Sequence, residues 1–254
     1  MSGLLPREHG AYAQLGFPLA TGLLYAGGQP GALAFTLAAV ALFLAHEPLA
    51  LRTGMRGPRL QRELGDRAGR RILFLGGMAA AGLLAAAWLA PARAWLGAIV
   101  PGGLGLLLLP ALGTKRMKSI PAETLAALVF STSLVPLALA GAAPLRDVTL
   151  AVLVWFGASF PAIFTVHAIK AALKKRPDER WLLTAAPAVA AATIAIFVVA
   201  GLAVPGASDL LAVLPPTLVT LTLSIRLPHP RLLKPVGWTM VVADALTLLL
   251  LFLL

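Results

Sequence analysis

Long apolar runs constrain this chain more than any other feature. A helix needs about 20 apolar residues to cross the hydrocarbon core of a bilayer. Only helices and closed barrels satisfy their backbone polar groups there, and these runs are too long and too continuous to be barrel strands. The sequence therefore predicts an all-α, polytopic membrane bundle of about nine transmembrane helices. Their approximate spans are 11–27, 31–51, 72–90, 94–112, 121–142, 148–169, 181–204, 208–226 and 236–254.

The composition supports a membrane protein. The chain is 59% hydrophobic and 12% charged, whereas soluble domains are about 45–50% apolar and about 25% charged. It has no cysteine, which excludes disulfides and thiolate metal sites. The longest polar segment, 52–71, is too short for a soluble domain. We therefore expect a single integral membrane domain over residues 1–254.

The basic residues predict the orientation of the bundle. Numbering the loops between the predicted spans places 19 of the 21 lysines and arginines on one side, and only Arg93 and Arg146 on the other. Lysine and arginine accumulate in cytoplasmic loops. We thus expect a multi-pass plasma membrane protein with a cytoplasmic N-terminus and an outside C-terminus. The net charge of +11 reflects topology and attraction to anionic headgroups, and indicates no nucleic-acid partner.

Ionisable residues gather at the predicted cytoplasmic ends of the helices. Such residues are costly in a membrane and by default mark a functional site. We expect His46, Glu47, Lys115, Arg116, His167 and Lys170 to converge on one cytoplasmic-side cavity. The full set of candidate substrate-binding residues is Glu8, His9, His46, Glu47, Arg52, Lys115, Arg116, Glu123, His167, Lys170 and Lys174.

The end of the sixth predicted span carries a basic stripe. His167, Lys170 and Lys174 are spaced i, i+3 and i+7, so they share one helical face. If they face inward, the two ammonium groups would bind phosphate or carboxylate as point charges. The alternative is that Lys170 and Lys174 only extend to the headgroups.

The pair His46-Glu47 interrupts the apolar end of the second span and has three interpretations. The first is a metal or proton-handling site with Glu8 and His9 nearby. The second is an ion pair between Glu47 and a basic residue of another loop, and the third is a passive helix end. Adjacent helical residues point about 100° apart, which weakens a two-ligand metal site. Asp244, inside the last span, has no evident partner, and its role stays open.

Two stretches resemble a known family. The segments "PREHGAYAQLGFPLATGL", from Pro6, and "HEPLALRTG", from His46, resemble the YwiC-like family of bacterial membrane proteins. The resemblance is expected to run along the whole chain. It implies a bacterial inner-membrane location.

The second, more distant resemblance is to the UbiA superfamily of intramembrane prenyltransferases. Residues Leu109 to Gly141 are similar to its Lys-Arg loop and fifth helix, so Lys115 and Arg116 would match a basic pair near the substrate diphosphate. That superfamily holds Mg²⁺ with Asp-rich motifs on helices 2 and 6. Here those places read His46-Glu47 and His167-x-x-Lys170-x-x-x-Lys174. The departure argues against magnesium-dependent transfer, and no cofactor is predicted.

These observations predict a UbiA-like membrane protein whose basic cytoplasmic-side cavity binds an anionic-headed lipid or isoprenoid. It would catalyse a metal-independent transfer, as a prenyltransferase-like enzyme lacking the usual Mg²⁺ site, or only bind or move the ligand. The alternatives are a small transporter using the His/Glu cluster as a polar path and an accessory subunit without a ligand. A transporter should carry polar groups near the midplane and on both sides. The sequence identifies no protein partner.

Overall fold

The computed structural model describes residues 9–111, 114–174, 177–229 and 232–254. Within these ranges the regular structure is helical throughout, without strands. The α-helices are α1 (His9–Ala26), α2 (Pro30–Arg52), α3 (Pro58–Leu89), α4 (Ala92–Leu108), α5 (Ile120–Thr132), α6 (Leu134–Ala140), α7 (Leu145–Lys174), α8 (Leu182–Ala203), α9 (Leu214–Arg226) and α10 (Leu233–Leu251). Short 3₁₀ turns are η1 (Lys115–Lys118), η2 (Pro177–Glu179) and η3 (Ser208–Val213).

Each predicted span corresponds to a helical segment, which confirms an all-α, polytopic membrane bundle. The fifth span is the α5–α6 pair, and the eighth is η3 with α9. In the described residues, six segments are long and apolar enough to cross a bilayer unaided, while α4 and the Pro235–Leu251 part of α10 are shorter apolar helices. The third helix begins at Pro58, well before the expected 72. Its first turns carry five of the seven arginines of the polar segment 52–71.

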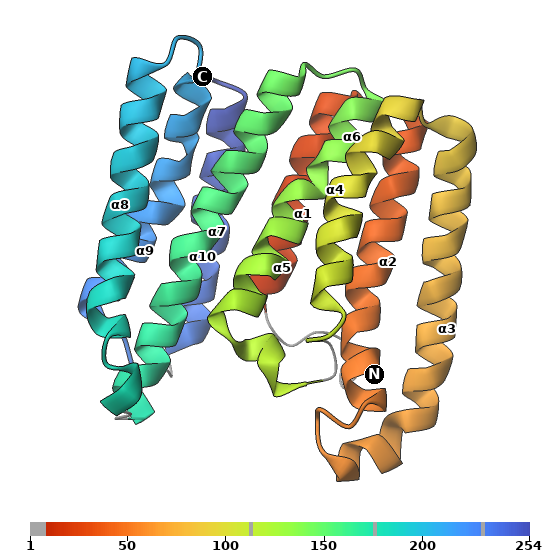
Figure 1. The fold of residues 1–254 in the computed structure, drawn as a ribbon, viewed down its shortest axis with the longest axis horizontal. Coiled ribbons are helices and arrows are strands. Elements are labelled where there is room, and N and C mark those ends of the chain that lie inside the picture. The colour runs from red at the N-terminus through yellow and green to blue at the C-terminus, as the bar shows by residue number, and fades with distance from the viewer. Residues whose placement is uncertain (1–8, 112–113, 175–176, 230–231) are drawn as a thin grey trace.

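The helices stand side by side, and their connections alternate between the two ends of the bundle (Figure 1). The connection from α2 to α3, η1 and η2 lie at one end, which we call the basic end because it gathers the arginine- and lysine-rich connections. The C-terminus lies at the other end. Large apolar side chains are exposed on the outer faces, such as Phe74 at 66% and Trp88 at 90% exposure. Such side chains suit a surface that faces lipid.

Helices α2 and α3 form a hairpin whose axes approach closely because small residues meet along it. A Cβ on Gly82 of α3 would lie 2.8 Å from the carbonyl oxygen of Ala34 and 3.0 Å from the amide nitrogen of Ala38 on α2. Further toward the open end of the hairpin, a Cβ on Gly31 would lie 2.8 Å from Ala90. Close backbone approach at small residues is how helices associate when lipid offers no hydrophobic gain.

The fifth span breaks at Ser133, where α5 ends and α6 begins. The hydroxyl of Ser133 donates to the carbonyl oxygen of Phe130 at 2.6 Å. Pro136 lies inside α6 and has no N–H to donate to the preceding turn. In the neighbouring core, the indole N–H of Trp155 on α7 donates to the hydroxyl of Thr21 on α1 at 2.9 Å. This bond ties α1 to α7 in the interior.

Candidate functional site

The end of α2 is built as a Schellman turn, which brings the chain back over its own last helical turns. Gly54 has a φ of +78°, which glycine adopts without the steric cost of a Cβ. Its N–H donates to Leu51 O at 3.1 Å, and the N–H of Met55 donates to Ala50 O at 3.0 Å. These are the two bonds of the motif. The connection therefore reverses immediately after Arg52, and residue 56 returns toward the helix.

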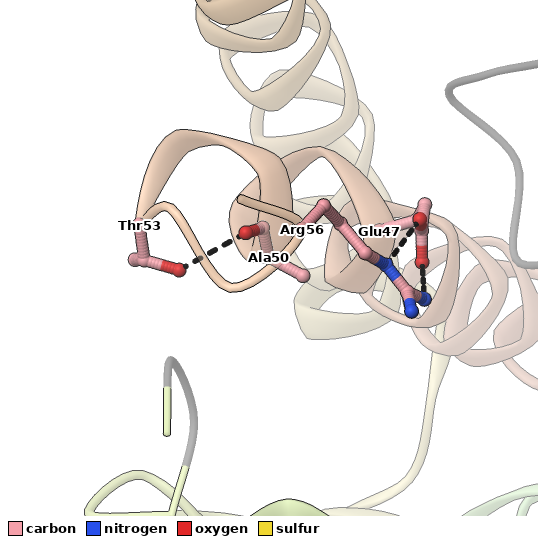
Figure 2. A network of polar contacts seen from close by, with 4 residues as sticks. All are labelled: Glu47, Ala50, Thr53 and Arg56. Carbon is pink, nitrogen blue, oxygen red and sulfur yellow. Dashed lines mark hydrogen bonds and ion pairs between the residues drawn. The ribbon is translucent and has the colours of Figure 1, made fainter. Parts of the chain in front are cut away.

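Arg56, in the connection that folds back over α2, forms a bidentate ion pair with Glu47. Its Nε lies 2.8 Å from Oε1 and its Nη2 lies 2.5 Å from Oε2. Figure 2 shows the guanidinium and the carboxylate side by side, with the Thr53 hydroxyl on the Ala50 carbonyl one turn away. Glu47 is only 2% exposed. The fork geometry satisfies both carboxylate oxygens, which a buried charge requires.

The structure thus favours the pairing interpretation of Glu47, with one correction. We expected the cation to come from another loop, but Arg56 belongs to the loop that directly follows α2. Arg56 was absent from the candidate residues. The sequence does carry a signal for this pair: Gly54 is followed two residues later by arginine. A Schellman turn at that glycine folds the next residues back toward the helix.

A second polar pair links α5 to α7. The Nε2 atom of His167 lies 3.0 Å from Oε2 of Glu123, and both side chains are partly exposed. Glu123 stands in the first turn of α5, where a carboxylate is favoured by the helix dipole. His167 lies near the end of α7. The sequence named both residues as candidates, and the structure brings them into contact.

Two cations stand on the elements that carry or precede this second pair. Lys170, one turn beyond His167, is half-buried, and Arg116 in η1 is exposed. Neither side chain forms a hydrogen bond or ion pair with any residue that the structure describes. The Glu123 carboxylate is already engaged by His167. We call the segment formed by η1, the start of α5 and the end of α7 the α5–α7 site; neither of its two cations is paired with a described side chain.

The remaining candidates fall in several places. His46 is half-buried on α2. Arg52 is exposed and lies 3.9 Å from the carboxylate of Asp66, itself fully exposed; such pairs contribute little. Glu8 and the side chains of His9, Lys115 and Lys174 lie outside the described residues.

The two polar pairs stand on different helices. Helix α2, which carries Glu47, packs mainly on α3, α6 and α1 and meets α5 through Phe43 and Phe130, whereas the Glu123–His167 pair joins α5 to α7. Within the described ranges, no three histidine, aspartate or glutamate side chains gather in a way that could hold a metal ion. The convergence of all six predicted residues on one cavity stays a prediction.

An apolar groove of about 410 Å³ lies between α1 and α10. Tyr12, Gly16 and Phe17 line it from α1, and Trp238, Val241 and Leu248 line it from α10. None of the predicted site residues whose side chains are described borders this groove. Its walls offer apolar contact and almost no polar groups.

The fold and these sites define a polytopic helical membrane protein. The chain belongs to the YwiC-like protein family, whose family model matches residues 5–138. The match covers α1 to the first part of α6, including the Glu47–Arg56 turn and Glu123, and it does not extend along the whole chain as the sequence led us to expect. No curated protein and no solved structure matches the chain. The distant resemblance to the UbiA superfamily stays a prediction.

Proposed function

We propose that this protein binds an anionic-headed lipid or isoprenoid at the α5–α7 site. The observation that carries the proposal is Lys170: a half-buried lysine at a membrane helix end, with no partner among the described residues. Partial burial of an ammonium is costly unless an opposite charge lies near it. The Glu123 carboxylate is engaged by His167, so an anionic ligand would supply the counter-charge to Lys170.

The site residues suit a phosphate-bearing headgroup. Lys170 acts as a point charge, while Arg116 presents the planar fork that matches phosphate oxygens. Glu123 and His167 fix the relative position of α5 and α7, and so of the two cations. Together these cations neutralise the ligand without a bound metal ion. The site either catalyses a metal-independent transfer or only binds or moves the ligand.

The basic end of the bundle would then face the cytoplasm of a bacterial cell, with the protein in the inner membrane. The 19-to-2 division of basic residues between the two ends supports this orientation. We expect a reporter that is active only in the cytoplasm to be inactive when fused after Leu254. Activity of that fusion would contradict the orientation.

Binding to the α5–α7 site should depend on its cations. We expect Lys170→Ala and Arg116→Ala each to weaken binding of an anionic lipid by about tenfold or more, because a hydrogen bond to a charged group contributes about 1.5–3 kcal/mol. Calorimetry on the purified protein in detergent measures this. Arg67→Ala is the matched control, since it removes one exposed positive charge from α3. Unchanged affinity in both site variants would overturn the proposal.

A further inference from the structure

Asp244 is a carboxyl group buried within the membrane bundle. It lies in the middle of α10 and is 8% exposed. It forms no hydrogen bond or ion pair with any residue that the structure describes. An acid in such a position is costly to ionise unless a partner or a bound ligand compensates its charge.

The packing of α9 against α10 shows what faces Asp244. The hydroxyl oxygen of Thr220 on α9 lies 3.8 Å from the sulfur of Met240 on α10, and the two helices run antiparallel (Figure 1). Asp244 follows Met240 by one turn on the same helix face, which places it near the level of Pro216 and Thr217. Pro216 has no N–H to donate.

The hydroxyl groups near this level also donate elsewhere. Thr217 donates to Val213 O at 2.9 Å, Thr220 to Pro216 O at 2.7 Å, and Thr247 to Ala243 O at 3.2 Å. Each of these hydroxyl groups is hydrogen-bonded to a carbonyl of its own helix, and none of the three donates to Asp244. Oxygen lone pairs near this level can therefore accept a hydrogen bond from a protonated Asp244.

No described charge compensates an ionised Asp244 from the elements that pack on α10, which are α1, α9 and η3. Their titratable and charged groups at described side chains are Tyr12 and Tyr25 on α1, Arg226 on α9 and Asp209 on η3. Arg226 is ten residues from Pro216, about 15 Å along the helix. Apart from Tyr12, the α1 residues that line the groove beside α10 have no polar side chain.

We propose that Asp244 is an intramembrane proton-binding site: at neutral pH the carboxyl group holds a proton, which it donates to an oxygen lone pair of α9. A proton fits the site better than a metal ion does. A metal needs several oxygen ligands, and Asp244 has no second carboxylate or histidine beside it among the described residues. This proposal does not depend on ligand binding at the α5–α7 site.

The test is labelling of the full-length protein in lipid nanodiscs with dicyclohexylcarbodiimide, an apolar reagent that reacts with protonated carboxyl groups. The acid proton passes to a reagent nitrogen, and a carboxylate oxygen bonds to the central carbon. The adduct rearranges to a stable N-acylurea, so the whole reagent is added and nothing leaves. Peptide mass spectrometry then locates the label.

We expect Asp244 to be labelled at neutral pH and Glu47 to stay unlabelled, because Glu47, even less exposed at 2% than Asp244 at 8%, is bound by the Arg56 guanidinium. The extent of labelling should be the same in sodium and in choline buffers. Asp244→Asn should melt like the wild type, since an amide replaces a neutral acid, and should lose one carboxylic-acid C=O band in the infrared spectrum. An unlabelled Asp244, protection by sodium, or an unchanged infrared spectrum in the variant would overturn the proposal.

Discussion

Glu47→Ala is expected to lower the free energy of unfolding by about 3 kcal/mol, the lower end of the about 3–5 kcal/mol measured when one partner of a buried ion pair is removed. The lower end applies because the side chain of Arg56 is 28% exposed and regains some solvent. Stability is lost because the substitution leaves the Arg56 guanidinium without its carboxylate partner at the end of α2. Equilibrium unfolding in mixed detergent, followed by circular dichroism, measures the effect.

The matched control is Glu63→Ala. Glu63 also pairs with an arginine, Arg59, at 2.9 Å, but both side chains are at least half exposed. Exposed pairs at i, i+4 contribute about 0.3–0.5 kcal/mol. The double variant Glu47→Ala/Arg56→Ala should be less destabilised than the sum of the single variants, because it leaves no unpaired charge. A Glu47→Ala protein that unfolds like the wild type would mean that water, and not Arg56, stabilises this carboxylate.

Gly82→Leu is expected to destabilise the α2–α3 hairpin by about 1–3 kcal/mol or more, as overpacking of a close contact does. The new Cβ would lie 2.8 Å from the Ala34 carbonyl oxygen. Backbone atoms cannot move aside as a flexible side chain can, so the two helices must separate. The midpoint of thermal unfolding, followed by tryptophan fluorescence, measures the change.

Gly77→Leu on the same helix is the control. A Cβ at Gly77 meets nothing within 4 Å, and the position is exposed toward lipid. Leucine is a better helix former than glycine by roughly 0.8 kcal/mol, so this variant should be as stable as the wild type or slightly more stable. Equal loss in both variants would show that α2 and α3 do not approach at Gly82 as described.

The sequence predicts the helical segments well because membrane helices need long apolar runs, and these stand out in any chain. It places the start of α3 poorly for a physical reason. The first turns of α3 project beyond the apolar run, and an arginine-rich helix outside hydrocarbon has no hydropathy signal. Pro58 at its first turn, after Gly57 with a φ of +97°, is the signal that hydropathy alone omits.

The sequence predicts some of the polar contacts and misses others. Helix spacing shows that His167 and Lys170 share a face, but it cannot show that His167 meets Glu123, because that contact depends on how α5 packs on α7. Arg56 was missed because its position depends on the left-handed Gly54 and not on sequence distance. For Asp244 the sequence shows an acid in a span, and only the structure reveals that the threonine hydroxyls near its level are hydrogen-bonded to backbone carbonyls.

The central claim is that cations of the α5–α7 site, and not a magnesium ion, neutralise an anionic ligand. Calorimetric titration of the wild-type protein with a prenyl diphosphate, with and without a chelator, tests this claim most directly. We predict the same affinity in both conditions and a clear loss in Lys170→Ala. Binding that the chelator abolishes and that Lys170→Ala leaves unchanged would contradict the claim.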